Sequence, residues 1–462
     1  MRKTNQNEPI NKFLKENLKR HPVSFHMPGH KYGKFALGEN KKIYGSFDIT
    51  EIPGADNIKK PNGIIKDSLE EISCIYGSLK SFYLTNGTTS GIHAIIRYAA
   101  LNGKKIILSR DCHISAVNGA ILFGVDTAFI PIEIEGGIPL PVSASAVLDA
   151  VSSNPEACGV LLTSPNYYGK TAHISEIAKI VHSRGMFLAI DEAHGSHFQF
   201  AGIKHKSGIN CGADIVCHSL HKTLPVYNQG AVIHVCSDII NIKQIGDAVN
   251  ILGTTSPSYP LMASMEKAVV YFNENGERSY RILKRKLAGL KNKVELIKNC
   301  KIIETDDFSR IIIKTGINGQ KAAEILHDKF NIDVEAADFN HIICISTPFN
   351  TKNDFIKLSK ALLKIGSLSN SNPIENSVVP DMPKKEIPLV EAYLSRQKTV
   401  SVDMAKGYIC GTIIVSYPPG TPLVCPGEII DGYTVEYIKK VINAGGYILG
   451  IEDNKIPVLE LT

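Results

Sequence analysis

An apolar run leads into a polar cluster that contains a lysine in the segment ADIVCHSLHKTLP (213–225). Ser219 and His221 lie close to Lys222 in the sequence. A lysine amine can condense with an aldehyde, and hydroxyl and imidazole groups can donate hydrogen bonds to a phosphate. The pattern therefore indicates a Schiff base between Lys222 and a cofactor that carries an aldehyde and a phosphate. Taken alone, a lysine after a strand is more often a solvated loop residue, so this interpretation depends on its surroundings.

An aspartate ends an apolar run in the segment FLAIDEAHGSH (187–197), 31 positions before Lys222. The four apolar residues predict a buried strand with Asp191 at its carboxyl end. A carboxylate paired with a pyridine nitrogen keeps that nitrogen protonated, so that the ring can accept electrons. A helix-capping or salt-bridged aspartate is the structural alternative. Two strand ends that carry complementary residue types favour the cofactor site.

A Gly-Thr-Thr-Ser turn precedes an amphipathic stretch in YLTNGTTSGIHAII (83–96). Backbone N–H groups and hydroxyls at a helix N-terminus bind phosphate well, which makes Gly87, Thr88 and Thr89 candidates. A plain helix N-cap explains this segment equally well.

In SRDCHISAVNGA (109–120), His113 also follows a strand-like run. His113 could lie flat against a pyridine ring, or it could simply cap the next helix.

Short apolar runs alternate with amphipathic stretches between about residues 80 and 240, which predicts an α/β fold with a mostly parallel sheet covered on both faces. Ligands bind beyond the carboxyl ends of the strands in such sheets, where the candidate residues stand. SEIAKIVHSRG (175–185) has helical spacing and a closing glycine. The runs that predict strands are KKIILS (104–109), GVLLTSP (159–165), MFLAIDEAHG (186–195) and ADIVCHS (213–219).

The chain of 462 residues is long enough for more than one core. A long surface helix is expected over 265–297. A smaller α+β unit is expected to follow, with strands at RIIIK and HIICIS and a helix at GQKAAEILHDKF. A stretch rich in Ser, Asn and Pro then indicates a linker. The predicted organisation is an N-terminal segment (1–45), a large cofactor-binding domain (46–275), a small α+β domain (276–366), a linker (367–388) and a C-terminal α+β domain (389–462).

Composition excludes several classes of protein. Hydrophobic residues make up 44% and charged residues 21%, which is ordinary for a globular protein. No apolar run is long enough to span a membrane, and the polar N-terminus lacks a secretory signal, so we expect a cytoplasmic protein without a membrane partner. The ten cysteines are scattered without metal-binding spacing, so neither disulfides nor a metal is expected. A net charge of +6 without a basic block does not point to nucleic acid.

The chain resembles the Orn/Lys/Arg decarboxylases, a bacterial family with the aspartate-aminotransferase fold. The resemblance runs through nearly the whole chain, and strings such as HMPGHK are far more specific than SxHK. The resemblance implies a fold type I enzyme that depends on pyridoxal 5'-phosphate. The matching strings are HMPGHKYG (26–33), DITEIPGADN (48–57), SPNYYG (164–169), TTSPSYP (254–260) and SYPPGTPLVCPGE (416–428).

By resemblance, Lys222 is the Schiff-base lysine, Asp191 the partner of the pyridinium nitrogen and His113 the stacking histidine. Ala193 and His194 lie near the other face of the ring. The resemblance further implies that the Thr254–Thr255–Ser256 segment reaches the phosphate of a neighbouring subunit, which makes the active unit at least a homodimer. The residues implied around the phosphate are Ser219, His221, Thr88 and Thr89.

Some features depart from the larger members of the family. Those members carry an additional N-terminal domain, whereas HMPGHK begins here at His26, so the chain resembles a short form for which a decamer is not expected. Ile114 stands where many relatives have lysine, and Lys170 follows YYG where an apolar residue is common. Both differences could alter substrate access.

The implied reaction is decarboxylation of arginine, lysine or ornithine, with arginine slightly favoured because short members are often assigned to it. An aminotransferase of the same fold is the nearest alternative, with Arg310 as the candidate carboxylate clamp, although a surface or interdomain arginine is the favoured interpretation of Arg310. A relative that keeps the fold without turnover is a third possibility. The carboxylates that could meet the distal cation of the substrate are Asp48, Glu51, Asp56 and Glu428.

Overall fold

The computed structural model describes residues 8–20, 23–24, 27–28, 31–32, 45–368, 381–417, 420–443 and 446–460. Most of the predicted linker and part of the HMPGHKYG string therefore lie outside the described residues. The chain divides into two compact units. The first unit comprises Met1–Tyr98 and Ala189–Arg278, and the second comprises Ala99–Leu188 and Ser279–Thr462. The candidate residues from Gly87 to Thr89 and from Asp191 to Thr255 belong to the first unit.

Four adjacent strands in the order β1, β9, β8, β7 belong to the first unit, except that the first two residues of β7 belong to the second. β7 runs parallel to β8, whereas β9 pairs antiparallel with both β8 and β1. Every residue of β7, β8 and β9 is buried, which explains their continuous apolar runs. The strands are β1 (Lys80–Leu84), β7 (Phe187–Asp191), β8 (Ile215–His218) and β9 (Ala231–Val235).

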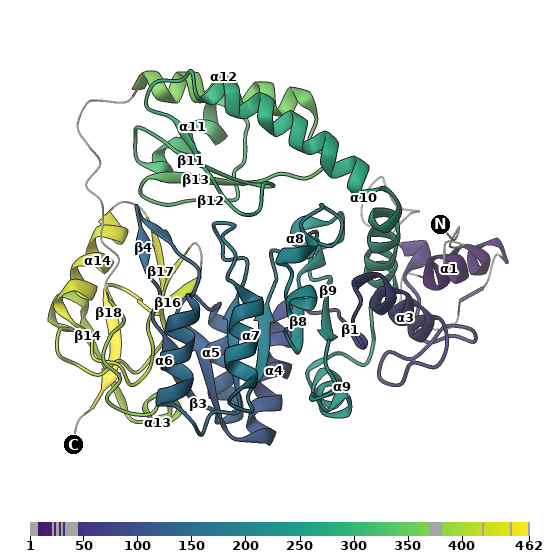
Figure 1. Ribbon diagram of the computed structural model, residues 1–462, viewed down its shortest axis with the longest axis horizontal. Helices are drawn as coiled ribbons and strands as arrows, with labels where there is room; N and C mark the ends of the chain where they lie inside the picture. Colours follow the sequence, from purple (N-terminus) through teal and green to yellow (C-terminus); the bar gives the residue numbers. More distant parts are fainter. Residues whose placement is uncertain are drawn as a thin grey trace. The chain divides into compact units, whose positions relative to one another are not determined.

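Helices of the first unit surround these strands (Figure 1). The N-terminal helix α1 was not predicted, because its few apolar residues stand among charges. It buries Ile10 and Leu14, and Glu266 accepts hydrogen bonds from the backbone N–H groups of Ile10 and Asn11 at its first turn. The helices are α1 (Pro9–Lys19), α3 (Ile64–Tyr76), α4 (Thr88–Asn102), α8 (Leu220–Thr223), α9 (Ile242–Leu252) and α10 (Tyr259–Val294), of which α4 and α10 continue into the second unit.

The second unit continues the α/β pattern with three parallel strands in the order β6, β2, β3. The chain moves outward from β2 to β3 through α5 and back to β6 through α6, so right-handed crossovers put these two helices on opposite faces of the strands. Both predictions, a mostly parallel sheet and covered faces, are confirmed. The elements are β2 (Lys105–Ser109), α5 (Ile114–Phe123), β3 (Asp126–Ile130), α6 (Ala144–Ser153), β6 (Gly159–Thr163) and α7 (Ile174–His182), with a short hairpin of β4 (Ile134–Glu135) and β5 (Ile138–Pro139).

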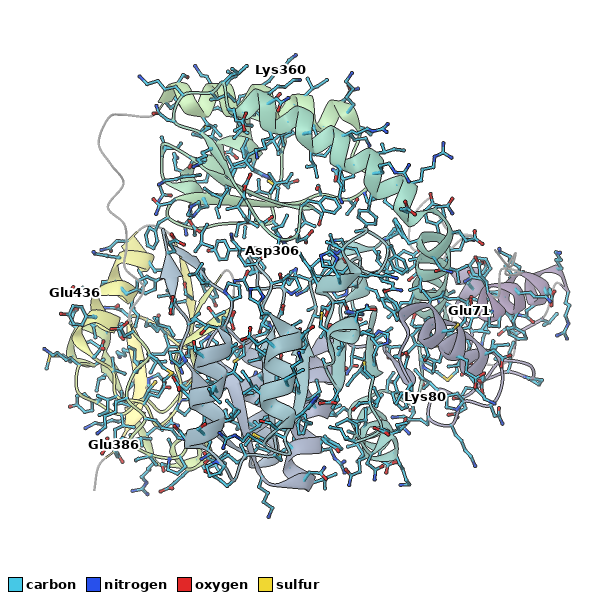
Figure 2. The ribbon with its side chains drawn as sticks, viewed as in Figure 1. Glu71, Lys80, Asp306, Lys360, Glu386 and Glu436 are labelled. Atoms are coloured by element: carbon cyan, nitrogen blue, oxygen red, sulfur yellow. The ribbon has the colours of Figure 1, made fainter. Side chains whose placement is uncertain are left out.

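A four-stranded antiparallel sheet in the order β10, β11, β13, β12 contains the strands predicted at RIIIK and HIICIS. Helices α11 and α12 lie on it (Figure 1). α12 buries Phe355, Leu358 and Leu362, whereas Lys360 projects into solvent (Figure 2). The elements are β10 (Lys301–Ile303), β11 (Arg310–Lys314), α11 (Gly319–Phe330), β12 (Ala336–Ala337), β13 (His341–Ile345) and α12 (Lys352–Leu368).

The C-terminal block has its own core, which includes Val402, Ile414 and Ile438. Two small antiparallel sheets, β14 with β18 and β16–β15–β17, enclose this core together with α14. Among the described residues, no helix is long and apolar enough to cross a membrane. The elements are α13 (Leu389–Leu394), β14 (Gln397–Ser401), β15 (Ile414–Tyr417), β16 (Thr421–Val424), α14 (Gly432–Asn443), β17 (Tyr447–Leu449) and β18 (Lys455–Leu459).

Candidate active site

Lys222 lies on a single helical turn immediately after strand β8. Ser219 precedes this turn, and the buried side chain of Leu220 anchors it. The Nζ atom of Lys222 lies 3.0 Å from Nε2 of His194. The hydroxyls of Thr223 and Ser196 are 2.6 Å apart and tie the same turn to the loop that follows β7. The lysine amine is therefore held beside an imidazole, at the carboxyl end of the strands.

Asp191 is the last residue of β7 and is buried. It stands opposite Cys217 in the parallel pairing of β7 with β8, and its Oδ1 accepts a hydrogen bond of 3.1 Å from the backbone N–H of Ala193. Burial raises the pKa of the Cys217 thiol well above its ordinary value, and the charge of Asp191 adds to that rise. Because Asp191 precedes His194 by three residues, β7 and its loop bring the carboxylate and the Lys222 amine to one region of the first unit.

Two hydroxyls meet at the start of helix α4. Gly87 has a φ of +82°, which a residue with a side chain rarely adopts, and this turn places Thr88 at the N-terminus of the helix. The Thr88 Oγ1 and Ser219 Oγ atoms are hydrogen-bonded to each other, and both residues are buried. The side chain of Thr89 is exposed. The helix N-terminus and the two hydroxyls together suit a dianionic group.

His221 is bonded to its own chain in a way that limits its chemistry. Its Nδ1 lies 3.0 Å from the carbonyl oxygen of Gly230, so Nδ1 carries the proton that it donates. Burial lowers the pKa of His221, and the charge of Lys222 lowers it further, although the bond to Gly230 acts in the opposite direction. A neutral imidazole that donates from Nδ1 has only a lone pair at Nε2, so this nitrogen can accept a hydrogen bond but not donate one. The bond from Nδ1 to Gly230 links the Lys222 turn to the 229–230 turn.

The chain matches known families and known structures over most of its length. Family models described as the major domain and the C-terminal domain of Orn/Lys/Arg decarboxylases match residues 8–311 and 380–453. The Bacillus subtilis (strain 168) protein named "Uncharacterized protein YaaO" is 30% identical over 96% of this chain and 96% of its own length. An arginine decarboxylase of Bacillus anthracis is 28% identical over 98% of this chain and 97% of its own length.

The chain belongs to the Orn/Lys/Arg decarboxylase family.

Solved structures show the same fold. The Francisella novicida lysine decarboxylase has a TM-score of 0.85 at 18% identity, over 99% of this chain and 82% of its own. The Escherichia coli constitutive lysine decarboxylase has a TM-score of 0.81 at 17% identity, over 98% of this chain and 82% of its own. These findings confirm the predicted family, the fold type I architecture, pyridoxal phosphate as cofactor and the decarboxylation of a basic amino acid as the reaction class.

The residues present in this Orn/Lys/Arg decarboxylase fit pyridoxal phosphate. Thr88 and Ser219 supply hydroxyl donors at a helix N-terminus for a phosphate, Asp191 supplies a carboxylate for a ring nitrogen, and Lys222 supplies an amine for an aldehyde. His113 belongs to the second unit, where its Nδ1 accepts a hydrogen bond of 3.2 Å from the Ser115 backbone N–H at the start of α5. The alternative of a helix cap is therefore observed for His113, and its stacking role stays a prediction.

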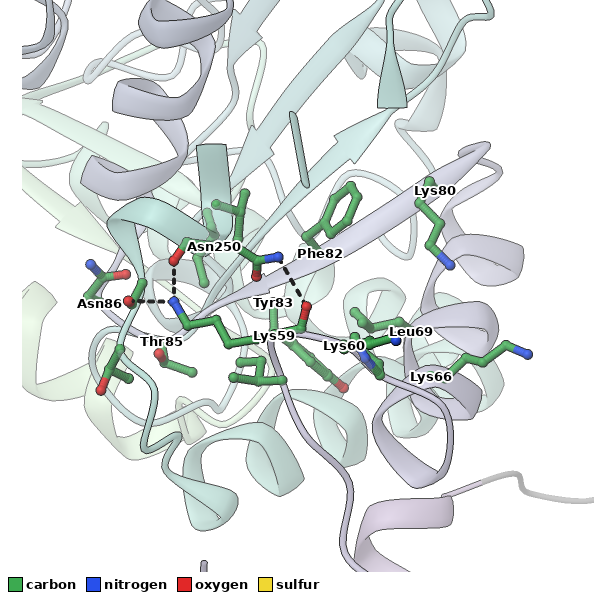
Figure 3. A pocket seen from close by; sticks show the side chains of 16 residues that line it. Lys59, Lys60, Lys66, Leu69, Lys80, Phe82, Tyr83, Thr85, Asn86 and Asn250 are labelled. Atoms are coloured by element: carbon green, nitrogen blue, oxygen red, sulfur yellow. Dashed lines mark hydrogen bonds between the residues drawn. The ribbon is translucent and has the colours of Figure 1, made fainter. Parts of the chain in front are cut away.

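The 254–256 segment of the decarboxylase is exposed and follows α9. Lys59 fixes the chain before it, because Nζ donates to the carbonyl oxygen of Gly253 at 2.8 Å and also to that of Asn250 (Figure 3). A cavity of about 260 Å³ lies beside these residues and is lined by the lysines 59, 60, 66 and 80 and by apolar groups such as Phe82. The structure thus presents Thr254 and Thr255 on the surface, and their contact with a second subunit stays a prediction.

Two of the four carboxylates that were suggested as contacts for the substrate cation are hydrogen-bonded within the protein. Asp56 accepts hydrogen bonds from the backbone N–H groups of residues 57, 62, 63, 65 and 66. Burial acts to raise its pKa, but these donors hold it below the ordinary value. Glu428 is buried and accepts bonds of 2.6 and 2.7 Å from the Arg110 guanidinium. Asp48 is half-buried and Glu51 is exposed.

Arg310 begins β11 and is buried in the small α+β region. Its guanidinium carbon lies 5.7 Å from the centre of the Tyr167 ring, and burial lowers its pKa although Asp307 acts to raise it.

Sequence reasoning missed a different feature, a row of buried polar side chains that contains Glu192, His218 and His234. Histidines inside otherwise apolar strand runs, in ADIVCHS and AVIHV, were the available signal.

Proposed function

We propose that the protein decarboxylates arginine in preference to lysine and ornithine, with Lys222 and Asp191 as its principal catalytic residues. The observation that carries this proposal is the position of Lys222 Nζ, 3.0 Å from His194 on the loop that follows Asp191. Bound pyridoxal phosphate supplies an aldehyde that reacts with amines and a ring that accepts the electrons of the breaking bond. The remaining work falls to side chains of this chain.

Lys222 would hold the cofactor through its amine, and the free amine would carry a proton to the substrate Cα. Asp191 holds a proton at the ring nitrogen, and its burial strengthens that interaction. Thr88 and Ser219 donate to the phosphate, and the N-terminus of α4 favours the negative charge. Ala193 and His194 would lie against the cofactor ring, and the stacking role of His113 stays a prediction. Gly87, Thr89 and His221 complete the turns that position these groups.

The active unit in this proposal is a cytoplasmic homodimer. The exposed Thr254–Ser256 segment supports it, because these hydroxyls are available to a second copy and Lys59 fixes their approach. Asp48 and Glu51 are the proposed contacts for the distal cation. The internal hydrogen bonds of Asp56 and the ion pair of Glu428 support leaving those two carboxylates out.

The preference for arginine is supported by the sequence identity and coverage of relatives whose names state a substrate. Relatives named arginine decarboxylase are 28–29% identical over 96–98% of this chain. An Escherichia coli protein named constitutive lysine decarboxylase is 24% identical over 58% of this chain. The deciding experiment incubates the purified protein and pyridoxal phosphate with arginine, lysine and ornithine in turn, and follows carbon dioxide and the amine by mass. Arginine should give the highest kcat/KM, and a keto acid in place of carbon dioxide would show an aminotransferase instead.

A further inference from the structure

A continuous row of buried polar side chains crosses the strands of the first unit. Oε2 of Glu192 accepts a hydrogen bond of 2.6 Å from the Gly208 backbone N–H, and Oε1 lies 3.3 Å from Nε2 of His218. Nδ1 of His218 lies 3.1 Å from Nε2 of His234, and Nδ1 of His234 lies 2.9 Å from Oγ of Ser81. All four side chains are at most 1% exposed. We call Glu192, His218, His234 and Ser81 the buried relay.

The donors and acceptors of the buried relay can be assigned so that its hydrogen bonds all run in one direction. Burial lowers the pKa of His234 well below its ordinary value, and repulsion from His218 adds to this, so His234 is neutral at neutral pH. If Ser81 donates to Nδ1 of His234, then Nε2–H of His234 donates to Nδ1 of His218. Nε2–H of His218 then faces the Glu192 carboxylate. Three of the four imidazole nitrogens are hydrogen-bonded, whereas the 3.3 Å contact between Nε2 of His218 and Oε1 of Glu192 is not a hydrogen bond.

The surroundings of the relay are tightly packed. The Tyr76 ring lies 5.1 Å from the His218 ring and 4.8 Å from the His234 ring, and its hydroxyl donates to the carbonyl oxygen of Ser196. A side chain at Gly208 would come within 3.2 Å of Glu192. Side chains held so closely cannot relax when one partner is removed, so a change in the relay is transmitted to the strands that carry it.

The carboxyl ends of β7 and β8, which carry Glu192 and His218, lead directly into the candidate active site. Glu192 follows Asp191, and its backbone N–H donates to the carbonyl oxygen of Cys217 at 3.0 Å. His218 precedes Ser219, which bonds Thr88 and starts the Lys222 turn. None of the mechanistic roles above uses the relay. A buried carboxylate and two histidines are costly to bury, so a structural purpose alone would be met more simply by apolar residues.

We propose that Glu192, His218 and His234 are positioning residues that fix the Asp191 carboxylate and the Ser219 hydroxyl against the cofactor. The inference rests on the proposed roles of Asp191 and Ser219. The relay links the end of β7 to β8, and β8 to β9, beside Asp191 and Ser219, and it places a second carboxylate one residue from Asp191. Its function is to keep Asp191 and Ser219 within the narrow range of positions in which both reach one bound ring.

The test uses Glu192→Gln and His234→Gln, which keep polar side chains of similar size, and Ser81→Ala, which removes the hydroxyl 2.9 Å from Nδ1 of His234 and leaves that of Ser78 at 3.4 Å. His341→Gln is the matched control, because His341 is also 1% exposed and lies 3.1 Å from a carboxylate, that of Asp338, but on β13. For each protein, the apoenzyme is titrated with pyridoxal phosphate, its melting temperature is recorded, and the absorption spectrum of the loaded enzyme is compared with that of the wild type.

We expect Glu192→Gln and His234→Gln to weaken cofactor affinity about 3- to 30-fold, to change the cofactor absorption band and to lower kcat about 10- to 100-fold with KM within about twofold. Ser81→Ala should show smaller changes in the same direction, and it remains informative if a histidine variant fails to fold. The proposal is overturned if the relay variants that fold bind the cofactor and turn over like the wild type, or if His341→Gln produces the same losses. Cofactor affinity is measured without substrate, so a wild-type protein that binds the cofactor but decarboxylates nothing would count against the proposed function only.

Discussion

The hydroxyls of Thr88 and Ser219 are hydrogen-bonded to each other although 131 residues separate them in the sequence. One opens helix α4 after strand β1, and the other follows strand β8. Neither residue could place a phosphate alone, because each sits on a different element. Their contact joins a helix N-terminus to the turn that carries Lys222, so that the proposed phosphate site and the Lys222 amine share one support.

Replacing Ser219 by alanine should weaken pyridoxal phosphate binding. A hydrogen bond to a charged group contributes about 1.5–3 kcal/mol, and 1.4 kcal/mol corresponds to a factor of ten. The dissociation constant of the apoenzyme should therefore rise about 10- to 100-fold, as measured by fluorescence titration. Ser237→Ala is the control, since this hydroxyl bonds Asp214 in the same unit and should leave the affinity unchanged. Unaltered affinity in Ser219→Ala would remove Ser219 from the phosphate site.

Replacing Lys222 by alanine should abolish covalent attachment of the cofactor and lower kcat about 10²- to 10⁴-fold, because the residue that carries a proton is lost. Borohydride reduction followed by peptide mass analysis should find the cofactor on the peptide that contains Lys222 in the wild type, and on no peptide in the variant. Lys243→Ala is a suitable control, because Lys243 lies on the surface of α9 and pairs with Asp247. Label on another lysine of the wild type would refute the assignment.

Replacing Asp191 by asparagine should lower kcat about 10- to 100-fold, because a charge-assisted hydrogen bond of about 1.5–3 kcal/mol is replaced by a weaker neutral one. The shape of the side chain and its contact with the Ala193 N–H can be kept. We expect KM for the amino acid to stay within about twofold, since the lost interaction is with the ring. Steady-state kinetics at saturating cofactor separate the two parameters. A variant with wild-type kcat would show that the ring nitrogen is not held by Asp191.

The sequence predicted those parts of the site that depend on local pattern. An apolar run of four residues is enough to deliver Asp191 to a strand end, and a glycine with positive φ before hydroxyl residues is enough to start α4 at Thr88. The contact of Lys222 with His194 could not be predicted by the same reasoning, because it depends on the path of the loop after β7. It entered only through the family resemblance, which placed His194 near the ring.

The roles of residues whose partners are far away in the sequence could not be predicted from the sequence either. Glu428 stands in a family-like string and looked available to a substrate, but its partner Arg110 is 318 positions away. Asp56 looked similar, yet it accepts backbone hydrogen bonds at the start of α3. Carboxylates are equally suited to a ligand cation and to an internal donor, so residue type alone does not separate the two uses.

The Arg110–Glu428 pair should contribute to stability and not to substrate affinity. Both groups are buried and bonded through two oxygens, so removing one partner leaves an uncompensated charge that costs about 3–5 kcal/mol. Glu428→Gln should lower the free energy of unfolding by an amount of this order in urea titrations, with KM unchanged. The double variant Arg110→Met, Glu428→Leu should recover part of the loss. A large rise in KM without loss of stability would return Glu428 to the list of substrate contacts.

His234 should make the apoenzyme sensitive to acid. Its pKa in the folded protein is well below 6.5 because of burial, whereas in the unfolded chain it has an ordinary value of about 6.5. Below that pH the unfolded chain binds a proton that the folded protein does not, so the free energy of unfolding falls as the pH falls. Between pH 6.5 and 5.5 this single residue should remove about 1 kcal/mol.

His234→Gln should therefore lose less stability between pH 6.5 and 5.5 than the wild type, even though the variant starts from a lower value. Urea titrations of both apoenzymes at the two pH values give the comparison. His327→Gln is the control of opposite sign, because its exposed imidazole bonds Asp333 and its pKa is raised, so it stabilises the fold at low pH. Its replacement should leave the acid loss as large as before or larger. An equal acid loss in the wild type and in His234→Gln would mean that burial does not lower the pKa of His234 in the folded protein.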